Sequence, residues 1–118
     1  GKEPWLDSHL KFYESVERDM HPVLAQRALE VGPEVELNDL KACDRFDVMD
    51  KLHQIKLPTY VMCGSEDEMT PVKYSNYLTD KIENAQQSVI AGGSHFMQLE
   101  KFRRVNEKIE GFMASLKG

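Results

Sequence analysis

Apolar residues in the first half of the chain recur at helical spacing. Over residues 5–20 they fall every three or four positions, which predicts an amphipathic helix. Pro22 forces a break or a new start. Residues 22–31 then predict a second short helix, which the Gly-Pro pair directly after them ends. A third helical pattern covers residues 37–53. The first apolar stripe consists of Leu6, Leu10, Tyr13, Val16 and Met20.

From residue 57 the pattern changes to short apolar runs separated by turns. Residues Thr59–Cys63 form such a run between a proline and a glycine, and they predict a buried strand. Thr70 can cap a helix that has Pro71 at its first position and ends near Asn84. A second short strand is predicted over Gln87–Ile90, closed by two glycines.

Residues 97–116 have the most regular pattern of the chain, with apolar positions three or four residues apart, and they predict a final helix. These positions are Leu99, Phe102, Val105, Ile109, Phe112, Met113 and Leu116. Residues 57–116 therefore predict strand–helix–strand–helix, which is normally a parallel crossover. Because two parallel strands alone do not form a stable sheet, further strands are expected from a missing part of the chain or from another copy.

Composition and charge exclude some functions. The chain has 118 residues, enough for one domain or a piece of one. Its net charge is −5, and the acidic excess lies within residues 1–40, which hold four Lys or Arg against nine Asp or Glu. A nucleic-acid partner would need a basic stripe, which is absent. No apolar stretch approaches the ~20 residues of a membrane span, and no signal peptide is visible.

The two cysteines, Cys43 and Cys63, do not have the spacing of a metal site, and no histidine pair has it either. Cys63 lies in the first predicted strand, where a free thiol acts as a small hydrophobic side chain. We therefore expect no metal, no cofactor, and a reduced, cytoplasmic protein.

Asp67 is the first candidate for chemistry. It lies between Gly64 and the Thr70-Pro71 pair, just beyond the first predicted strand. In open parallel sheets, active sites form at this carboxyl edge. The alternative is a structural aspartate that accepts hydrogen bonds from amides in an acidic turn. This motif alone favours neither.

His95 is the second candidate, in the loop after the second predicted strand. Gly92 and Gly93 precede it, and they allow a tight turn with space around the imidazole. Because both loops leave the same edge of the sheet, we expect Asp67 to reach His95. A carboxylate in that position fixes the imidazole tautomer and stabilises its charged form, which is the supporting half of a nucleophile–His–acid triad.

Residues 41–116 resemble the C-terminal part of the α/β-hydrolase superfamily. Residues 46–59 resemble the lead-in to the acid-bearing strand of that family, and residues 64–71 resemble its acid loop. Residues 84–96 are similar to the histidine strand and loop, and residues 105–112 to the final helix. The order and spacing of these motifs carry the resemblance, since no single one is decisive.

The resemblance implies an α/β fold whose sheet is incomplete in this chain, with Asp67 as triad acid and His95 as base. It implies that residues 1–40 are the end of a helical cap and residues 41–118 the C-terminal part of the core. The family places its nucleophile in a G-x-S-x-G elbow ahead of the acid and the histidine, and no such elbow occurs here. We therefore expect a fragment of a hydrolase that acts on a small-molecule substrate, and an inactive isolated chain.

Met69, Phe96 and Met97 flank the expected pair and are predicted to line an apolar pocket, with Met69 and Phe96 as the substrate-binding candidates. Open strand edges predict self-association of the chain. Two alternatives stay open: a binding or scaffold protein with the hydrolase fold but no nucleophile, and a small α+β interaction domain in which Asp67 and His95 meet by coincidence. The bond type, whether ester, thioester, amide or carbon–carbon, is not determined by these residues.

Overall fold

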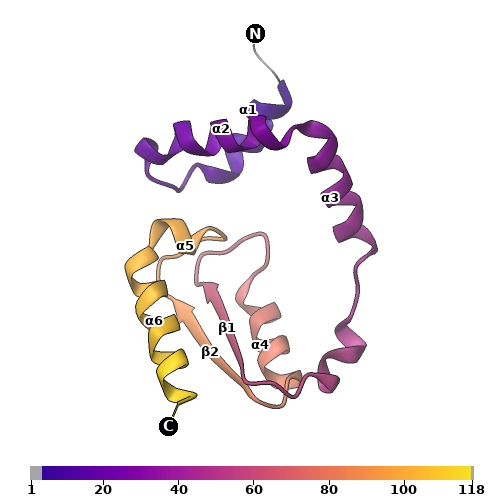
Figure 1. Ribbon diagram of the computed structural model, residues 1–118, viewed down its shortest axis with the longest axis vertical. Helices are drawn as coiled ribbons and strands as arrows, with labels where there is room; N and C mark the ends of the chain where they lie inside the picture. The colour runs from indigo at the N-terminus through magenta and orange to yellow at the C-terminus, as the bar shows by residue number, and fades with distance from the viewer. Residues whose placement is uncertain (1–3, 118) are drawn as a thin grey trace. The chain divides into compact units, whose positions relative to one another are not determined.

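The computed structural model describes residues 4–117 (Figure 1). The chain divides into two compact units, with the boundary between Asp47 and Val48. The described part of the first unit is helical, and the second unit contains both strands.

Residues 4–47, the described part of the first unit, contain five short helical segments. In chain order they are α1 (Pro4–Leu10), η1 (Lys11–Tyr13), η2 (Arg18–Met20), α2 (His21–Val31) and α3 (Pro33–Arg45), of which η1 and η2 are single 3-10 turns. The prediction over residues 22–31 is confirmed by α2, which has Pro22 in its first turn.

The helix expected over residues 5–20 is wrong, because the chain bends after η1. The Nε2 nitrogen of His21 lies 3.1 Å from the carbonyl oxygen of Tyr13 and 3.0 Å from that of Val16. An N–H at Nε2 donates to both carbonyls, which in a continuous helix would accept from backbone N–H groups four residues further on. The apolar spacing could not predict this competition, since the donor is the His21 ring, which follows Met20, the last residue of the apolar stripe.

Gly32 separates α2 from α3 and has a φ of +85°, a conformation that favours glycine. Pro33 then begins α3, so the Gly-Pro pair both ends one helix and starts the next. The helix predicted over residues 37–53 is therefore wrong at both ends. Its second half is a separate 3-10 helix of the second unit, η3 (Met49–Gln54).

The second unit is built on a parallel pair of strands, β1 (Thr59–Gly64) and β2 (Ala85–Ile90), which are aligned from first residue to last. The connecting helix is α4 (Val72–Lys81), and α5 (Met97–Glu100) and α6 (Phe102–Ser115) follow β2. This arrangement confirms the predicted strand–helix–strand–helix unit. A parallel sheet of two strands is small for an α/β fold and agrees with an incomplete one.

The sheet lies between α4 and α6 (Figure 1). The Tyr60 ring packs against Phe112 of α6, with ring centroids 4.9 Å apart. Tyr60 is opposite Gln86 in the register, so Gln87 points to the other face, where it donates a hydrogen bond to Asn76 of α4. The two helices therefore cover opposite faces of the sheet.

Two boundaries in the second unit differ from the predictions for a local reason. Pro71, and not Thr70, is the cap residue of α4, because the Thr70 hydroxyl donates to the Asp67 carboxylate. The helix predicted over residues 97–116 is interrupted at Lys101, whose φ of −124° and ψ of 40° are not helical. α5 is consequently a single short turn, directly after the loop that contains His95.

The core of the second unit is small. Its buried apolar side chains are Leu52, Val61, Cys63, Ile82, Ile90 and Val105. Several large apolar side chains of α6 remain exposed, among them Phe102, Ile109 and Met113. Contiguous apolar side chains at a surface mark a contact site for other parts of a protein or for another chain.

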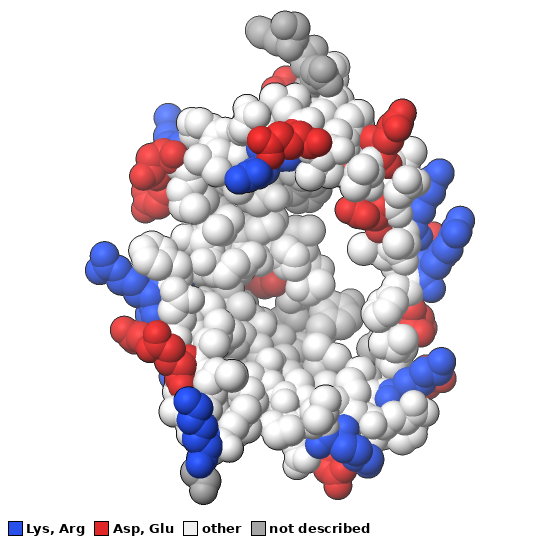
Figure 2. All heavy atoms as spheres, viewed as in Figure 1, with Lys and Arg blue, Asp and Glu red and all other residues white. Residues whose placement is uncertain are grey.

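The surface charge is mixed. On the face of residues 4–117 drawn in Figure 2, Lys and Arg side chains are interspersed with Asp and Glu and form no continuous basic patch. Within the same residues, no helix is both long and apolar enough to pass through a lipid bilayer.

Candidate active site

The two candidate residues lie in loops that leave the same edge of the sheet. Gly64 ends β1 and Ile90 ends β2, and these two residues are paired in the register. We call residues 65–71 the Asp67 loop and residues 91–96 the His95 loop.

Backbone hydrogen bonds join the two loops. The Ser65 N–H donates to the Ile90 carbonyl (3.0 Å), and the Gly92 N–H donates to the Ser65 hydroxyl oxygen (2.8 Å). The Glu66 N–H donates to the Gly93 carbonyl (2.8 Å). These contacts hold the loops at a fixed separation before either candidate side chain is considered.

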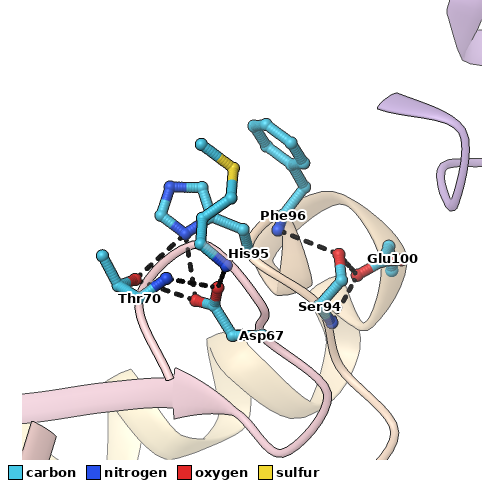
Figure 3. A network of polar contacts seen from close by, with 7 residues as sticks. Asp67, Thr70, Ser94, His95, Phe96 and Glu100 are labelled. Atoms are coloured by element: carbon cyan, nitrogen blue, oxygen red, sulfur yellow. Dashed lines mark hydrogen bonds and ion pairs between the residues drawn. The ribbon is translucent and has the colours of Figure 1, made fainter. Parts of the chain in front are cut away.

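The Asp67 carboxylate is buried, with the residue 8% exposed, and it accepts four hydrogen bonds. Oδ1 accepts from the backbone N–H groups of Met69 and Thr70, each at 2.9 Å. Oδ2 accepts from the Thr70 hydroxyl at 3.0 Å and lies 2.9 Å from Nδ1 of His95. Figure 3 shows the carboxylate between Thr70 and His95.

Burial acts to raise the pKa of Asp67, because it disfavours the charged carboxylate. Hydrogen bonds to the carboxylate act in the opposite direction and together outweigh burial. They come from the Thr70 backbone N–H, the His95 ring and the Thr70 hydroxyl, and the charge of His95 adds to their effect. They hold the pKa of Asp67 below its usual value. The carboxyl group is therefore ionised at neutral pH.

The His95 ring is oriented by this carboxylate. Its Nδ1 nitrogen faces Asp67 Oδ2 and lies 3.1 Å from the Thr70 hydroxyl oxygen. An ionised carboxylate only accepts hydrogen bonds, so it favours the tautomer with the proton on Nδ1. The Nε2 nitrogen then carries the lone pair. In Figure 3 this second ring nitrogen points away from Asp67. The side chain of His95 is 36% exposed.

Phe96 and Met69 are placed differently around the pair. The Phe96 ring meets the His95 ring edge to face, with centroids 5.3 Å apart and planes at 85°. Met69 is 53% exposed, and its backbone N–H, not its side chain, bonds to Asp67.

A hollow of about 280 Å³ adjoins the pair. Asp67 and His95 both contribute to its wall, and β1, α4 and α5 supply apolar side chains. These include Val61, Cys63, Tyr74, Leu78 and Met97. Met97, one of the three residues expected to line an apolar pocket, lines this hollow, whereas Met69 and Phe96 do not.

A second polar network lies in the His95 loop. Oε1 of Glu100 accepts from the Ser94 N–H at 2.8 Å and from the Ser94 hydroxyl at 2.6 Å. The Ser94 hydroxyl oxygen in turn accepts from the Phe96 N–H at 3.1 Å. The residues on either side of His95 are thus tied to one carboxylate.

Three polar side chains at this site, Thr70, Ser94 and Glu100, were not predicted as functional from the sequence. For Thr70 a signal existed, because a threonine three residues after an aspartate can bond back to it. For Ser94 and Glu100 there was none, since their contact depends on the one-turn helix α5.

A metal site does not accompany the pair. Among residues 4–117, no three His, Cys, Asp or Glu side chains are grouped so that they could hold a metal ion. Neither cysteine forms a disulfide: Cys43 is exposed and Cys63 is buried.

A parallel α/β unit with an aspartate–histidine pair at its carboxyl edge is the architecture expected of an α/β-hydrolase. A sequence model of the alpha/beta hydrolase fold matches residues 12–102, which is most of the chain. The chain belongs to this family. The match confirms the resemblance and extends it into the first unit.

Among curated proteins, the monoacylglycerol lipase ABHD6 of Mus musculus is 28% identical over 72 residues. The matched segment is 61% of this chain and 21% of the lipase. The chain therefore spans about a fifth of the length of that relative.

Solved structures agree on the fold. A thermophilic esterase matches with a TM-score of 0.76 and 32% identity, over 93% of this chain and 45% of the esterase chain. A bromoperoxidase from Bacillus anthracis matches with a TM-score of 0.83 over 93% of this chain and 43% of that chain. Its identity of 21% shows the fold alone.

Proposed function

We propose that Asp67 and His95 are the acid and the base of a nucleophile–His–acid triad in a hydrolase. The observation that carries this proposal is the 2.9 Å contact between Asp67 Oδ2 and His95 Nδ1. The carboxylate is anchored by further hydrogen bonds from Met69 and Thr70, so it can orient the ring without moving itself. A partly exposed imidazole with a free lone pair on Nε2 is suited to proton transfer.

In this mechanism His95 accepts and then donates one proton in each of two steps, the formation and the hydrolysis of the acyl-enzyme. Nε2 takes the proton of the nucleophile as that group attacks the acyl carbon, and then gives it to the leaving group as the acyl bond breaks. Nε2 next takes a proton from a water molecule that attacks the acyl-enzyme, and returns it to the nucleophile as the acid product leaves. Asp67 stays ionised and stabilises the positive charge on His95 at each stage.

The nucleophile and the oxyanion-hole donors would come from another part of a longer protein. None of the serines of this chain lies in a G-x-S-x-G elbow, and the chain spans less than half of the length of the relatives described above. We expect the 118-residue chain alone to show no triad activity, since an acid and a base without a nucleophile leave the difficult step uncatalysed.

The first unit fits the end of a helical cap. Its described residues are all in helices or their connections, and the family match begins within it at residue 12. For the substrate we propose a carboxylic ester. The names of the lipase and the esterase among the relatives support an ester.

The test uses the longer protein and a chromogenic ester. Asp67→Asn should lower kcat by about four orders of magnitude, and His95→Ala by at least as much, because the triad acts as a unit. Asp50→Asn in η3, where the side chain is exposed, is the matched control and should keep normal activity. A loss of less than about tenfold in Asp67→Asn would overturn the assignment, given the size of the effect expected of a triad acid.

The residue in the nucleophile elbow of the longer protein separates the enzyme from the scaffold alternative. Serine, cysteine or aspartate there supports a hydrolase. Glycine or alanine supports a binding protein with the same fold, and activity would then be absent even with Asp67 and His95 intact.

A further inference from the structure

We infer that Glu100 is a positioning residue for His95, acting through Ser94; this inference rests on the proposed role of His95 as the base. The Glu100 carboxylate bonds to Ser94, the residue before His95, so its effect on the imidazole is indirect. Glu100 controls the position of the backbone that carries the imidazole.

The geometry ties both neighbours of His95 to one carboxylate (Figure 3). Glu100 Oε1 accepts from the N–H and the hydroxyl of Ser94, at 2.8 Å and 2.6 Å. The same hydroxyl oxygen accepts from the N–H of Phe96 at 3.1 Å. His95 lies between these two residues, so its backbone is fixed from both sides.

Glu100 is itself held in place. It is the last residue of α5, and its N–H donates to the Phe96 carbonyl at 3.1 Å. The Met97 N–H donates to the Ser94 carbonyl at 3.2 Å. Residues 94–100 therefore form a closed ring of hydrogen bonds. The two bonds from Ser94 to the Glu100 carboxylate, at 2.8 Å and 2.6 Å, are the shortest of these.

The hydrogen bonds to the Asp67 loop hold the His95 loop at Gly92 and Gly93, before His95 itself. Gly92 has a φ of +76°, a conformation that favours glycine. The His95 side chain is 36% exposed, and packing therefore restrains it only in part. Asp67, by contrast, is buried and held by four hydrogen bonds. Glu100 therefore matters more for the position of His95 than for the position of Asp67.

The test measures the tautomer of His95 in the 118-residue chain, by long-range proton–nitrogen NMR at a pH where the ring is neutral. In the unmodified chain the Nδ1–H form should predominate, since Nδ1 faces Asp67. In Glu100→Ala the ring loses its alignment with Asp67, and the Nδ1–H form should no longer be the majority. Glu100→Gln keeps an oxygen acceptor without the charge and should restore part of the preference.

Glu110→Ala is the matched control, because Glu110 is an exposed glutamate of α6. It should leave the tautomer unchanged. Ser94→Ala provides a second and smaller change, which removes only the hydroxyl, and it should shift the tautomer in the same direction as Glu100→Ala. Because this readout follows the hydrogen bond between Asp67 and His95, a role of Glu100 in general stability would not move it in a chain that remains folded by circular dichroism.

The inference is overturned if the Nδ1–H form remains the majority in folded Glu100→Ala, or if its fraction is unchanged in folded Ser94→Ala. In the longer enzyme, Glu100→Ala should lower kcat by about 10²-fold with little change in KM, the loss expected for a misplacement of about 1 Å. The two proposals fail separately: full activity of Asp67→Asn would refute the triad, whereas the tautomer experiment involves no substrate and no nucleophile.

Discussion

Gly64 and Gly93 approach each other so closely that a Cβ atom on Gly64 would lie 2.1 Å from the Gly93 carbonyl oxygen. The neighbouring Glu66 N–H donates to that same carbonyl. The two loops therefore meet backbone to backbone, and this contact sets the distance across which Asp67 reaches His95. A side chain at position 64 cannot fit without separating the loops, because the opposing atom is backbone.

Gly64→Ala should destabilise the chain by about 1–3 kcal/mol, the usual cost of forcing extra volume into a packed site. The matched control is Gly111→Ala in α6, where an added Cβ meets nothing within 4 Å. That substitution should stabilise the chain by up to about 1 kcal/mol, because alanine is the better helix former. Urea unfolding of the three proteins measures both changes. Equal stability of the two variants would contradict the close approach.

The lowered pKa of Asp67 predicts how stability depends on pH. A carboxyl group whose pKa is lower in the folded state than in the unfolded state stabilises the fold when ionised. That stabilisation is complete above the unfolded pKa of about 4 and is lost as the pH falls through the lower folded value. The unmodified chain should therefore lose stability more steeply than Asp67→Asn below about pH 4.

Urea midpoints measured at several pH values for both proteins test this. Asp50→Asn should follow the unmodified chain, since Asp50 is exposed and lies outside the site. Parallel curves for the unmodified chain and Asp67→Asn would mean that Asp67 is not stabilised in its ionised form.

Thr70→Val removes a hydroxyl while keeping the shape of the side chain. The Thr70 hydroxyl donates to Asp67 Oδ2, so its loss should raise the pKa of Asp67 and cost about 1–3 kcal/mol of stability, as for a hydrogen bond to a charged group. Carboxyl carbon NMR of Asp67 against pH measures the first effect. Thr79→Val is the control, because the Thr79 hydroxyl donates to the Ser75 carbonyl within α4. An unmoved titration of Asp67 in Thr70→Val would rule out this contribution.

The isolated chain should self-associate. The sheet of the described residues has only two strands, and α6 carries exposed apolar side chains at Phe102, Ile109 and Met113. Both features favour contacts between copies. Sedimentation velocity over a range of concentrations should show a dimer or larger species, and Ile109→Lys with Met113→Lys should shift the distribution toward the monomer. A single monomeric species at all concentrations would refute this prediction.

Much of the second unit could be predicted from local patterns. Thr59–Cys63 is apolar between two breakers, and the observed strand extends it by one residue to Gly64. Residues 87–90 predicted the end of β2 but not its start at Ala85, because Ala85 and Gln86 are not part of an apolar run and join the strand through pairing with β1. The errors were largest in the first unit. There the His21 ring donates to the carbonyl oxygens of Tyr13 and Val16, which a continuous helix over residues 5–20 would have used for its own backbone hydrogen bonds.

The candidate site was predicted only in part. Asp67 and His95 could be found because each directly follows a strand, and the ends of parallel strands meet at one edge. The pocket side chains were less predictable, since the directions of Met69, Phe96 and Met97 depend on how each loop turns. Thr70 was expected to cap α4, but its hydroxyl bonds to Asp67, because a buried carboxylate gains more from a hydrogen bond than an exposed helix end does.

The sequence by itself determined the order of the elements in the second unit, the family, and the two residues that carry the candidate chemistry. These depend on residue type and on spacing along the chain, which are local. Only the tertiary structure decided that Asp67 is buried and anchored, that Gly64 meets Gly93, and that Glu100 holds both neighbours of His95. Each of these depends on atoms that come within about 3 Å only after the chain has turned, the range in which hydrogen bonds form.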